Sequence, residues 1–187
     1  MQEKTDEDIA VQVCGGNSNA FGILVERYER KITRYAKRFL FNYRNIDDAV
    51  QDVFIKAYIN IQGFDTNRKF SPWIYRIAHN EFINLIKKTG KEPLPLFDPD
   101  TLFPYLASNE RTDKGLNDQE VKEEIEKCLG KLSPNYREPL VLYYFEDMDY
   151  KTIADVLKIP ISTVGVRINR GKKILRKIYD KTILKLE

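Results

Sequence analysis

The sequence predicts an all-α protein made of two small helical domains joined by a flexible linker. Apolar residues recur at three- and four-residue steps over several segments, which is the period of an amphipathic helix. No segment alternates apolar and polar residues over a length typical of a strand. Four of the eight prolines fall between residues 89 and 115, where the helical period stops. We therefore expect helical domains at residues 1–88 and 118–187, with a linker at residues 89–117.

Three segments of the first domain have one apolar helical face. The second of these helices follows the acidic pair Asp47 and Asp48, which suits the positive end of a helix dipole. The third has Ser71 as its predicted N-cap and Pro72 at the first helical position, and it runs to about Lys88. The apolar faces are Phe21, Leu24, Tyr28, Ile32, Tyr35 and Phe39 in the first helix, Val50, Val53, Phe54, Ala57 and Ile61 in the second, and Ile74, Ile77, Ala78, Phe82 and Leu85 in the third.

The second domain ends in the pattern of a helix-turn-helix. A short amphipathic helix at residues 150–157 is followed by a turn at residues 158–160. Ser162 is placed to cap a second helix that runs to about Lys177 and turns Val164, Ile168, Gly171 and Leu175 inward. Two helices are expected before this motif, one with the apolar face Val121, Ile125, Cys128 and Leu129, the other starting at Ser133 and Pro134.

The second helix of the motif is predicted to present a basic outer face. A helix of this width fits the major groove of DNA, and its N-terminal residues reach the base edges. Residues 158–187 contain nine Lys and Arg against two acidic residues, a net charge of +7, whereas residues 118–157 carry −5. Such clustered cations favour contacts with phosphates. The alternative is a solvated basic face on a structural helix. The outward residues are Thr163, Val166, Arg167, Arg170 and Lys173.

Aromatic and basic residues are interleaved between Gly63 and Asn80 in the first domain. Rings with nearby cations can stack on unpaired bases, and Arg76, Asn80 and Lys87 would share one helix face opposite the apolar stripe. These features predict a second DNA-facing surface, with Phe64 exposed in a loop. The alternative is that the aromatic side chains belong to the core. The interleaved residues are Phe64, Phe70, Trp73 and Tyr75 with Arg68, Lys69 and Arg76.

The outer face of the second helix combines acidic and amide groups with an exposed apolar side chain. It consists of Asp48, Gln51, Asp52 and Ile55. Nucleic acid would be repelled by these carboxylates, so the face suits a protein partner or is simply solvated.

Several classes of protein are excluded by the composition. No apolar run is long enough to span a membrane, and the acidic first ten residues do not form a secretory signal. The two cysteines, Cys14 and Cys128, have no metal-site spacing, and His79 is the only histidine. The glycines form no phosphate-binding loop. We expect a cytoplasmic protein that is not an enzyme and binds no metal or cofactor.

Two long segments resemble known regions of bacterial sigma factors. Residues 47–88, DDAVQDVFIKAYINIQGFDTNRKFSPWIYRIAHNEFINLIKK, resemble sigma region 2. Residues 136–178, YREPLVLYYFEDMDYKTIADVLKIPISTVGVRINRGKKILRKI, resemble sigma region 4. With only these two regions, the chain resembles the extracytoplasmic-function (ECF) sigma factors. The resemblance covers roughly residues 18–88 and 120–180.

The resemblance implies a partner for each surface. Core RNA polymerase would be bound through its β′ clamp helices and β flap, and an anti-sigma factor would mask the polymerase-binding surfaces. The linker would thread toward the active-site cleft. The implied polymerase contacts are Asp48, Gln51, Asp52 and Ile55. The implied contacts with the promoter −10 element are Lys56, Phe64, Asn67, Phe70, Trp73, Arg76, Asn80 and Lys87. The implied contacts with the −35 element are Ser162, Thr163, Val166, Arg167, Arg170 and Lys173.

The sequence departs from the family pattern at two places, and two other functions are possible for such a chain. Gly165 stands where the family often has a basic residue, and Lys87 and Lys88 stand where it often has arginines. A stand-alone helix-turn-helix regulator would need neither the aromatic loop nor the acidic face. A nuclease would need converging carboxylates, and Asp47, Asp48 and Asp52 lie on a single helix.

Overall fold

The computed structural model describes residues 4–41, 43–89 and 118–183, and all regular structure in these ranges is helical. The all-α prediction is confirmed. The elements in chain order are α1 (Asp6–Cys14), η1 (Ser18–Ala20), α2 (Phe21–Phe39), α3 (Ile46–Asn60), η2 (Ile61–Gly63), α4 (Phe70–Thr89), α5 (Asp118–Gly130), α6 (Pro134–Tyr144), α7 (Tyr150–Leu157) and α8 (Ile161–Ile183). Among the described residues, none of the helices is long and apolar enough to cross a membrane.

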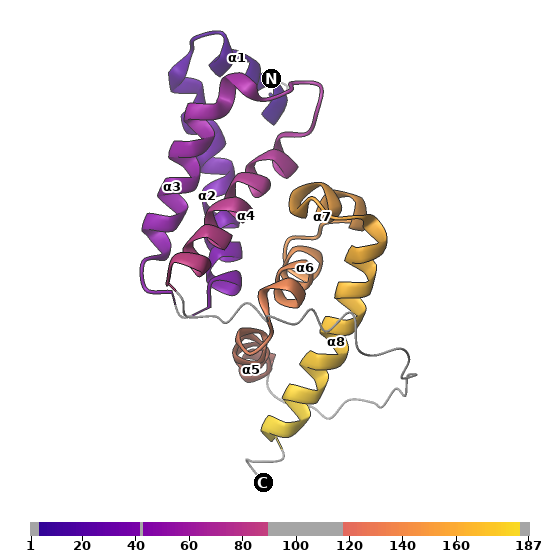
Figure 1. The fold of residues 1–187 in the computed structure, drawn as a ribbon. Helices are drawn as coiled ribbons and strands as arrows, with labels where there is room; N and C mark the ends of the chain where they lie inside the picture. Colours follow the sequence, from indigo (N-terminus) through magenta and orange to yellow (C-terminus); the bar gives the residue numbers. More distant parts are fainter. Residues whose placement is uncertain (1–3, 42, 90–117, 184–187) are drawn as a thin grey trace.

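Helices α1–α4 form the first group of helices (Figure 1). The whole predicted apolar face of α2 is buried, and α3 buries its predicted stripe against α2 and α4. Helix α4 begins at Phe70, one residue before the predicted N-cap Ser71, and Pro72 lies inside its first turn. The prediction of Ser71 as the cap was therefore wrong, and the Phe70 amide donates instead to the carboxylate of Glu7, at 3.0 Å.

Helix α1 was not predicted, although its start is well defined. The side chains and backbones of Thr5 and Asp8 form a capping box, which satisfies two amides at the helix start. Ile9, Ala10 and Val13 are buried and attach α1 to α2.

Helices α5–α8 form the second group, with the predicted helix-turn-helix in α7 and α8. Asp149 caps α7 by accepting a hydrogen bond of 2.7 Å from the Thr152 amide. Lys158 ends α7 in the left-handed conformation, with φ of 56°. Helix α8 starts at Ile161, so Ser162 lies within its first turn and is not the predicted cap. The helix also extends beyond the predicted end near Lys177, to Ile183.

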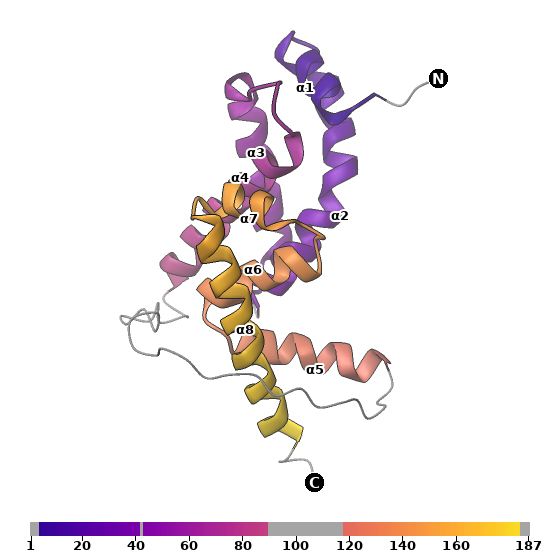
Figure 2. The same cartoon turned by 90° about the vertical axis from the view of Figure 1, so that its right-hand side faces the viewer.

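The two groups pack against each other over α2 with α6 and α4 with α7 (Figures 1 and 2). The sequence interpretation, with two separate domains on a linker, did not anticipate this contact. Apart from Thr89, the predicted linker at residues 89–117 lies outside the described residues.

Candidate nucleic-acid and partner-protein interfaces

The outer face of α3 presents all four predicted partner-binding residues to solvent. Asp48, Gln51 and Asp52 are exposed, and Ile55 is 48% exposed. Ile59, one turn further along, is 69% exposed and extends the apolar part of the face. Ile59 was not among the predicted residues, although its i+4 spacing from Ile55 indicates that it shares this face. Apolar side chains gathered beside carboxylates favour a protein partner over a merely solvated face.

The aromatic cluster at the start of α4 is largely core. Phe70 is completely buried and Phe64 is 6% exposed, so the expectation that Phe64 is exposed in a loop is wrong. Their rings pack edge-on at 5.5 Å, and Tyr28 packs on Phe70 at 5.4 Å. Trp73 lies against both phenylalanines but remains partly exposed. Of these three predicted aromatic contacts, only Trp73 offers ring surface that a base could reach in this conformation.

An open cavity of about 860 Å³ adjoins this cluster. Its walls come from the loop that precedes α4, from α4 itself and from α7. The walls include Phe64, Lys69, Trp73, Arg76, Asp149 and Asp155. The predicted −10 surface therefore faces the first helix of the helix-turn-helix.

Arg76 spans this junction between α4 and α7. Its Nη2 donates to Oδ1 of Asp155 at 2.7 Å, and its Nε donates to the Asp155 carbonyl at 3.2 Å. Lys158 donates to the same carboxylate oxygen at 3.0 Å. Burial opposes ionisation of Asp155, but the Lys158 hydrogen bond and the Arg76 charge outweigh burial, so the pKa of Asp155 is lowered. Asp155 is thus held as an anion beside Arg76.

The remaining predicted −10 residues lie around the same surface with different partners. Asn80 and Lys87 are exposed on α4. Lys56 forms an ion pair with Glu81. The Asn67 side-chain amide donates to Asp65 at 3.1 Å, which orders the loop. Arg76, in contrast, hydrogen-bonds to the second group of helices.

Helix α8 places its predicted faces only in part as expected. Val164, Ile168 and Gly171 are buried, whereas Ser162, Val166 and Lys173 are exposed. The other predicted −35 residues, Thr163, Arg167 and Arg170, are partly buried. The outer side of α8 therefore combines polar and basic side chains with the exposed Val166.

Buried polar contacts join the two groups of helices and were missed by the sequence analysis. The Tyr35 hydroxyl donates to Glu138, and Nδ1 of His79 lies 2.6 Å from the same carboxylate oxygen. Burial and the Glu138 charge raise the pKa of Tyr35 well above its usual value. Arg137, also buried, donates to the Phe39 carbonyl at 2.7 Å. A local pattern could not indicate these contacts, since the partners are far apart in sequence.

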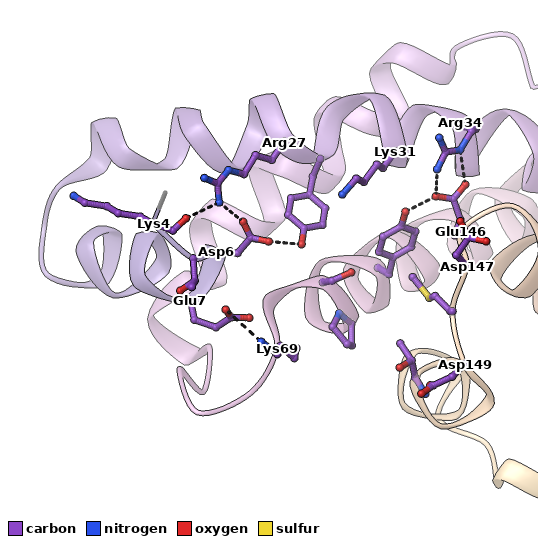
Figure 3. Close-up of a pocket in the computed structure, with 17 residues that line it drawn as sticks. Lys4, Asp6, Glu7, Arg27, Lys31, Arg34, Lys69, Glu146, Asp147 and Asp149 are labelled. Atoms are coloured by element: carbon purple, nitrogen blue, oxygen red, sulfur yellow. Dashed lines mark hydrogen bonds and ion pairs between the residues drawn. The ribbon is translucent and has the colours of Figure 1, made fainter. Parts of the chain in front are cut away.

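A second cavity, of about 970 Å³, is lined by residues of α1, α2 and α4 and of the segment 146–152 (Figure 3). Arg34 on α2 donates two hydrogen bonds, of 2.9 and 2.7 Å, to Glu146 after α6. The Tyr75 hydroxyl donates to Glu146 at 2.6 Å. Burial and the Glu146 charge raise the pKa of Tyr75. Arg27 is likewise paired with Asp6, 2.7 Å apart. The cavity is thus lined by ion pairs. The described residues hold no group of three or more His, Cys, Asp or Glu that could bind a metal ion.

Two family models match the chain. Sigma-70 region 2 matches residues 24–92, and Sigma-70, region 4 matches residues 122–175. The ECF RNA polymerase sigma factor SigW of Bacillus subtilis is 36% identical over 174 residues, which cover 89% of this chain and 92% of SigW. The RNA polymerase sigma factor CnrH of Cupriavidus metallidurans is 31% identical over 184 residues, which cover 95% of this chain and 96% of CnrH.

Solved structures show the same fold. CnrH in complex with the cytosolic domain of CnrY matches with a TM-score of 0.71 at 28% identity, over 95% of this chain and 99% of the other. The sigma factor RpoE in complex with the anti-sigma factor NepR from Bartonella quintana matches with a TM-score of 0.65 at 22% identity, over 86% of this chain and 96% of the other.

Proposed function

Since the chain belongs to the ECF RNA polymerase sigma factors, we propose that three of its surfaces divide the work of promoter-specific initiation. The face of α3 binds core polymerase, the α4 surface binds the −10 element, and α8 binds the −35 element. The chain performs no chemistry of its own, since RNA synthesis belongs to the core enzyme. It acts in the cytoplasm, where polymerase and promoter DNA are found.

The polymerase-binding role rests on the chemistry of the α3 face. Asp48, Gln51 and Asp52 supply charge and hydrogen-bonding groups, and Ile55 supplies apolar area that a partner would cover. The family resemblance assigns this partner as the β′ clamp helices, with a second contact from the helix-turn-helix group to the β flap.

The −10 role rests on Trp73 and the polar residues around it. Trp73 offers a partly exposed ring for a base, and Arg76 offers a guanidinium for a phosphate. Phe64 and Phe70 pack against Trp73, with their ring centroids 5.2 and 5.4 Å from its ring centroid. Lys56, Asn67, Asn80 and Lys87 complete the proposed surface.

The −35 role rests on the outer side of α8. Ser162, Thr163 and Val166 lie in the first two turns, the part of a recognition helix that reaches base edges. Arg167, Arg170 and Lys173 follow and suit the phosphates on either side of the groove.

An anti-sigma factor is a further proposed partner. The solved structure of RpoE contains the anti-sigma factor NepR, and that of CnrH contains the cytosolic domain of CnrY. The exposed α3 face, with Ile55 and Ile59, is a surface that such a partner could cover.

Transcription in a purified system tests the proposal. The protein is mixed with core polymerase and a library of promoter fragments, and the transcripts are mapped. We expect start sites that depend on the added protein. If it yields no specific transcripts but shifts duplex DNA by itself, the alternative of a stand-alone helix-turn-helix regulator would be favoured.

A further inference from the structure

Val166 is an exposed apolar side chain on the proposed −35 face of α8. It is 43% exposed, whereas Val164 and Ile168, two residues before and two residues after it, are buried in the core. Val166 follows Ser162 by four residues and precedes Arg170 by four, so these three side chains lie on one face of the helix. The valine is therefore directed away from the core and into the row of residues proposed to meet DNA.

The side chains that surround Val166 at the start of α8 are short. Residues 161–166, ISTVGV, contain none of the Arg, Lys, Asn or Gln side chains that form paired hydrogen bonds with guanine or adenine. Gly165 adds no side chain, and a Cβ at this position would meet only the Tyr150 ring, at 3.5 Å. Ile161 is also exposed but lies about 140° away from Val166 around the helix axis. A helix with this start can approach bases closely, and Val166 offers them an apolar contact.

Thymine is the base whose edge matches such a contact. Among the four bases of DNA it alone carries a methyl group in the major groove, on C5, and apolar side chains recognise this group. A valine that packs on the methyl group removes apolar surface of both partners from water, which stabilises the complex. The same valine against the exposed donors and acceptors of another base would leave those groups without hydrogen bonds. The contact therefore favours thymine in two ways.

The other residues of this face have less capacity to select a base. Ser162 and Thr163 can pair with more than one base, because a hydroxyl group both donates and accepts. The basic residues that follow suit phosphates, and contacts with phosphates orient a protein without reading the sequence. Val166 is thus the residue on this face best suited to set a preference. The basic residues are Arg167, Arg170 and Lys173.

We propose that Val166 selects thymine at one position of the −35 element by packing against its 5-methyl group. This inference rests on the proposed role of α8 in −35 binding. Deoxyuridine lacks the methyl group and should not replace thymidine at this position. 5-Methylcytosine presents the same methyl group with different hydrogen-bonding groups, so it should replace thymine, whereas cytosine should not.

Single replacements of thymine in a promoter test the proposal. Holoenzyme is formed with the full chain, and its affinity for a promoter recovered from the library is measured by competition. Each thymine of the −35 element, on both strands, is replaced in turn by deoxyuridine. We expect one replacement to weaken binding about three- to fivefold, the effect of one methyl group that is no longer buried. At that position 5-methylcytosine, paired with guanine, should bind more tightly than cytosine by a similar factor.

The Val166→Ala variant identifies the residue that reads the methyl group. Holoenzyme with this variant should bind the thymine and deoxyuridine fragments equally well, because the shorter side chain does not reach the methyl group. Val11→Ala removes the same atoms at a position on α1 that is 51% exposed, and this control should keep the difference. The proposal is overturned if the recovered −35 elements contain no thymine, if no replacement weakens binding, or if Val166→Ala keeps the full effect of deoxyuridine.

Replacement of the entire −35 element separates this inference from the proposed function. We expect an unrelated sequence at −35 to weaken holoenzyme binding far more than one deoxyuridine does. If it does so while every deoxyuridine is tolerated, α8 still binds the −35 element and the reading of thymine by Val166 is refuted. If the unrelated sequence leaves binding unchanged, the −35 role of α8 and the role of Val166 both fail.

Discussion

Glu7 and Phe70 connect the first helix of the chain to the start of the proposed −10 helix. The Glu7 carboxylate accepts a hydrogen bond of 3.0 Å from the Phe70 amide, 63 residues away. This amide belongs to the first turn of α4 and has no acceptor within the helix. Helix α1, which precedes the region matched by the family model, thereby helps to set where α4 begins.

Replacing Glu7 with alanine should destabilise the start of α4. The loss resembles that of an N-cap, so we expect the free energy of unfolding in urea to fall by about 1 kcal/mol. Glu7→Gln keeps an acceptor oxygen and should lose less. Glu26→Ala, at an exposed position on α2, serves as the control. Equal losses in Glu7→Ala and Glu26→Ala would show that the contact does not stabilise the fold.

Two glycines of α8 should respond in opposite directions to alanine. A Cβ at Gly171 would lie 2.9 Å from Cδ1 of Leu140 and 3.3 Å from the Tyr136 carbonyl, so α6 would be pushed away. We expect Gly171→Ala to lower the midpoint of thermal unfolding, at a cost of about 1–3 kcal/mol.

A Cβ at Gly165 meets only the Tyr150 ring, at 3.5 Å. Gly165→Ala should therefore stabilise α8 by up to about 1 kcal/mol. If the midpoint of thermal unfolding fell for both variants, the space found beside Gly165 would not accommodate a Cβ.

The stabilising effect of the Asp155 charge should depend on pH in the acid range. Because the pKa of Asp155 in the folded chain lies below its usual 3.8, its charge stabilises the fold above that pH, and the stabilisation is lost as the pH falls through the lower, folded-state value. The difference in unfolding free energy between wild type and Asp155→Asn should be constant from about pH 7 to pH 5 and shrink toward pH 3. Urea unfolding at each pH measures it. A difference that instead grew in acid would mean that the pKa is raised.

Arg170→Ala should weaken binding to duplex DNA carrying the −35 element and reduce its salt dependence. Loss of one phosphate contact lowers the slope of log K against log salt by about 1. Holoenzyme binding measured from 50 to 300 mM salt gives the slope. Lys37→Ala, on the exposed side of α2, should leave it unchanged. An unaltered slope for Arg170→Ala would place the recognition surface elsewhere.

Asp52→Arg should weaken binding to core polymerase by about tenfold or more, because it reverses a charge within the proposed interface. The helical content should stay the same, since Asp52 is exposed. Circular dichroism checks the fold, and competition binding to core polymerase checks the affinity. Glu29→Arg, which makes the same charge change on α2, is the matched control. If both variants bind core equally well, the α3 face is not the polymerase contact.

The elements that sequence reasoning predicted well are those with a strong local period. The face of α2 from Phe21 to Phe39 repeats at helical spacing and is buried throughout. The inward stripe of α8, with Val164 and Ile168, was predicted for the same reason. Such patterns indicate which face of a helix is buried, so the helix can be predicted from its own residues alone.

The features that could not be predicted are the non-local polar contacts. Tyr35 and Glu138 meet across 103 residues, and no spacing rule pairs a tyrosine with a carboxylate at that separation. Phe64 was misread because its neighbours Gly63 and Asp65 are polar or flexible, whereas its burial depends on Phe70 and Trp73. Arg137 was unremarked in a helix whose apolar residues dominated the pattern, although it is 1% exposed.

The pairing of Arg76 with Asp155 also bears on where the free protein resides in a cell. A genome offers on the order of 10⁶–10⁹ non-specific sites, and a chain with two exposed cationic surfaces would be distributed over them. While Arg76 is paired with Asp155, fewer of the cationic groups of the chain are available to this reservoir. We therefore expect more of the free chain to remain in solution, where it can meet polymerase.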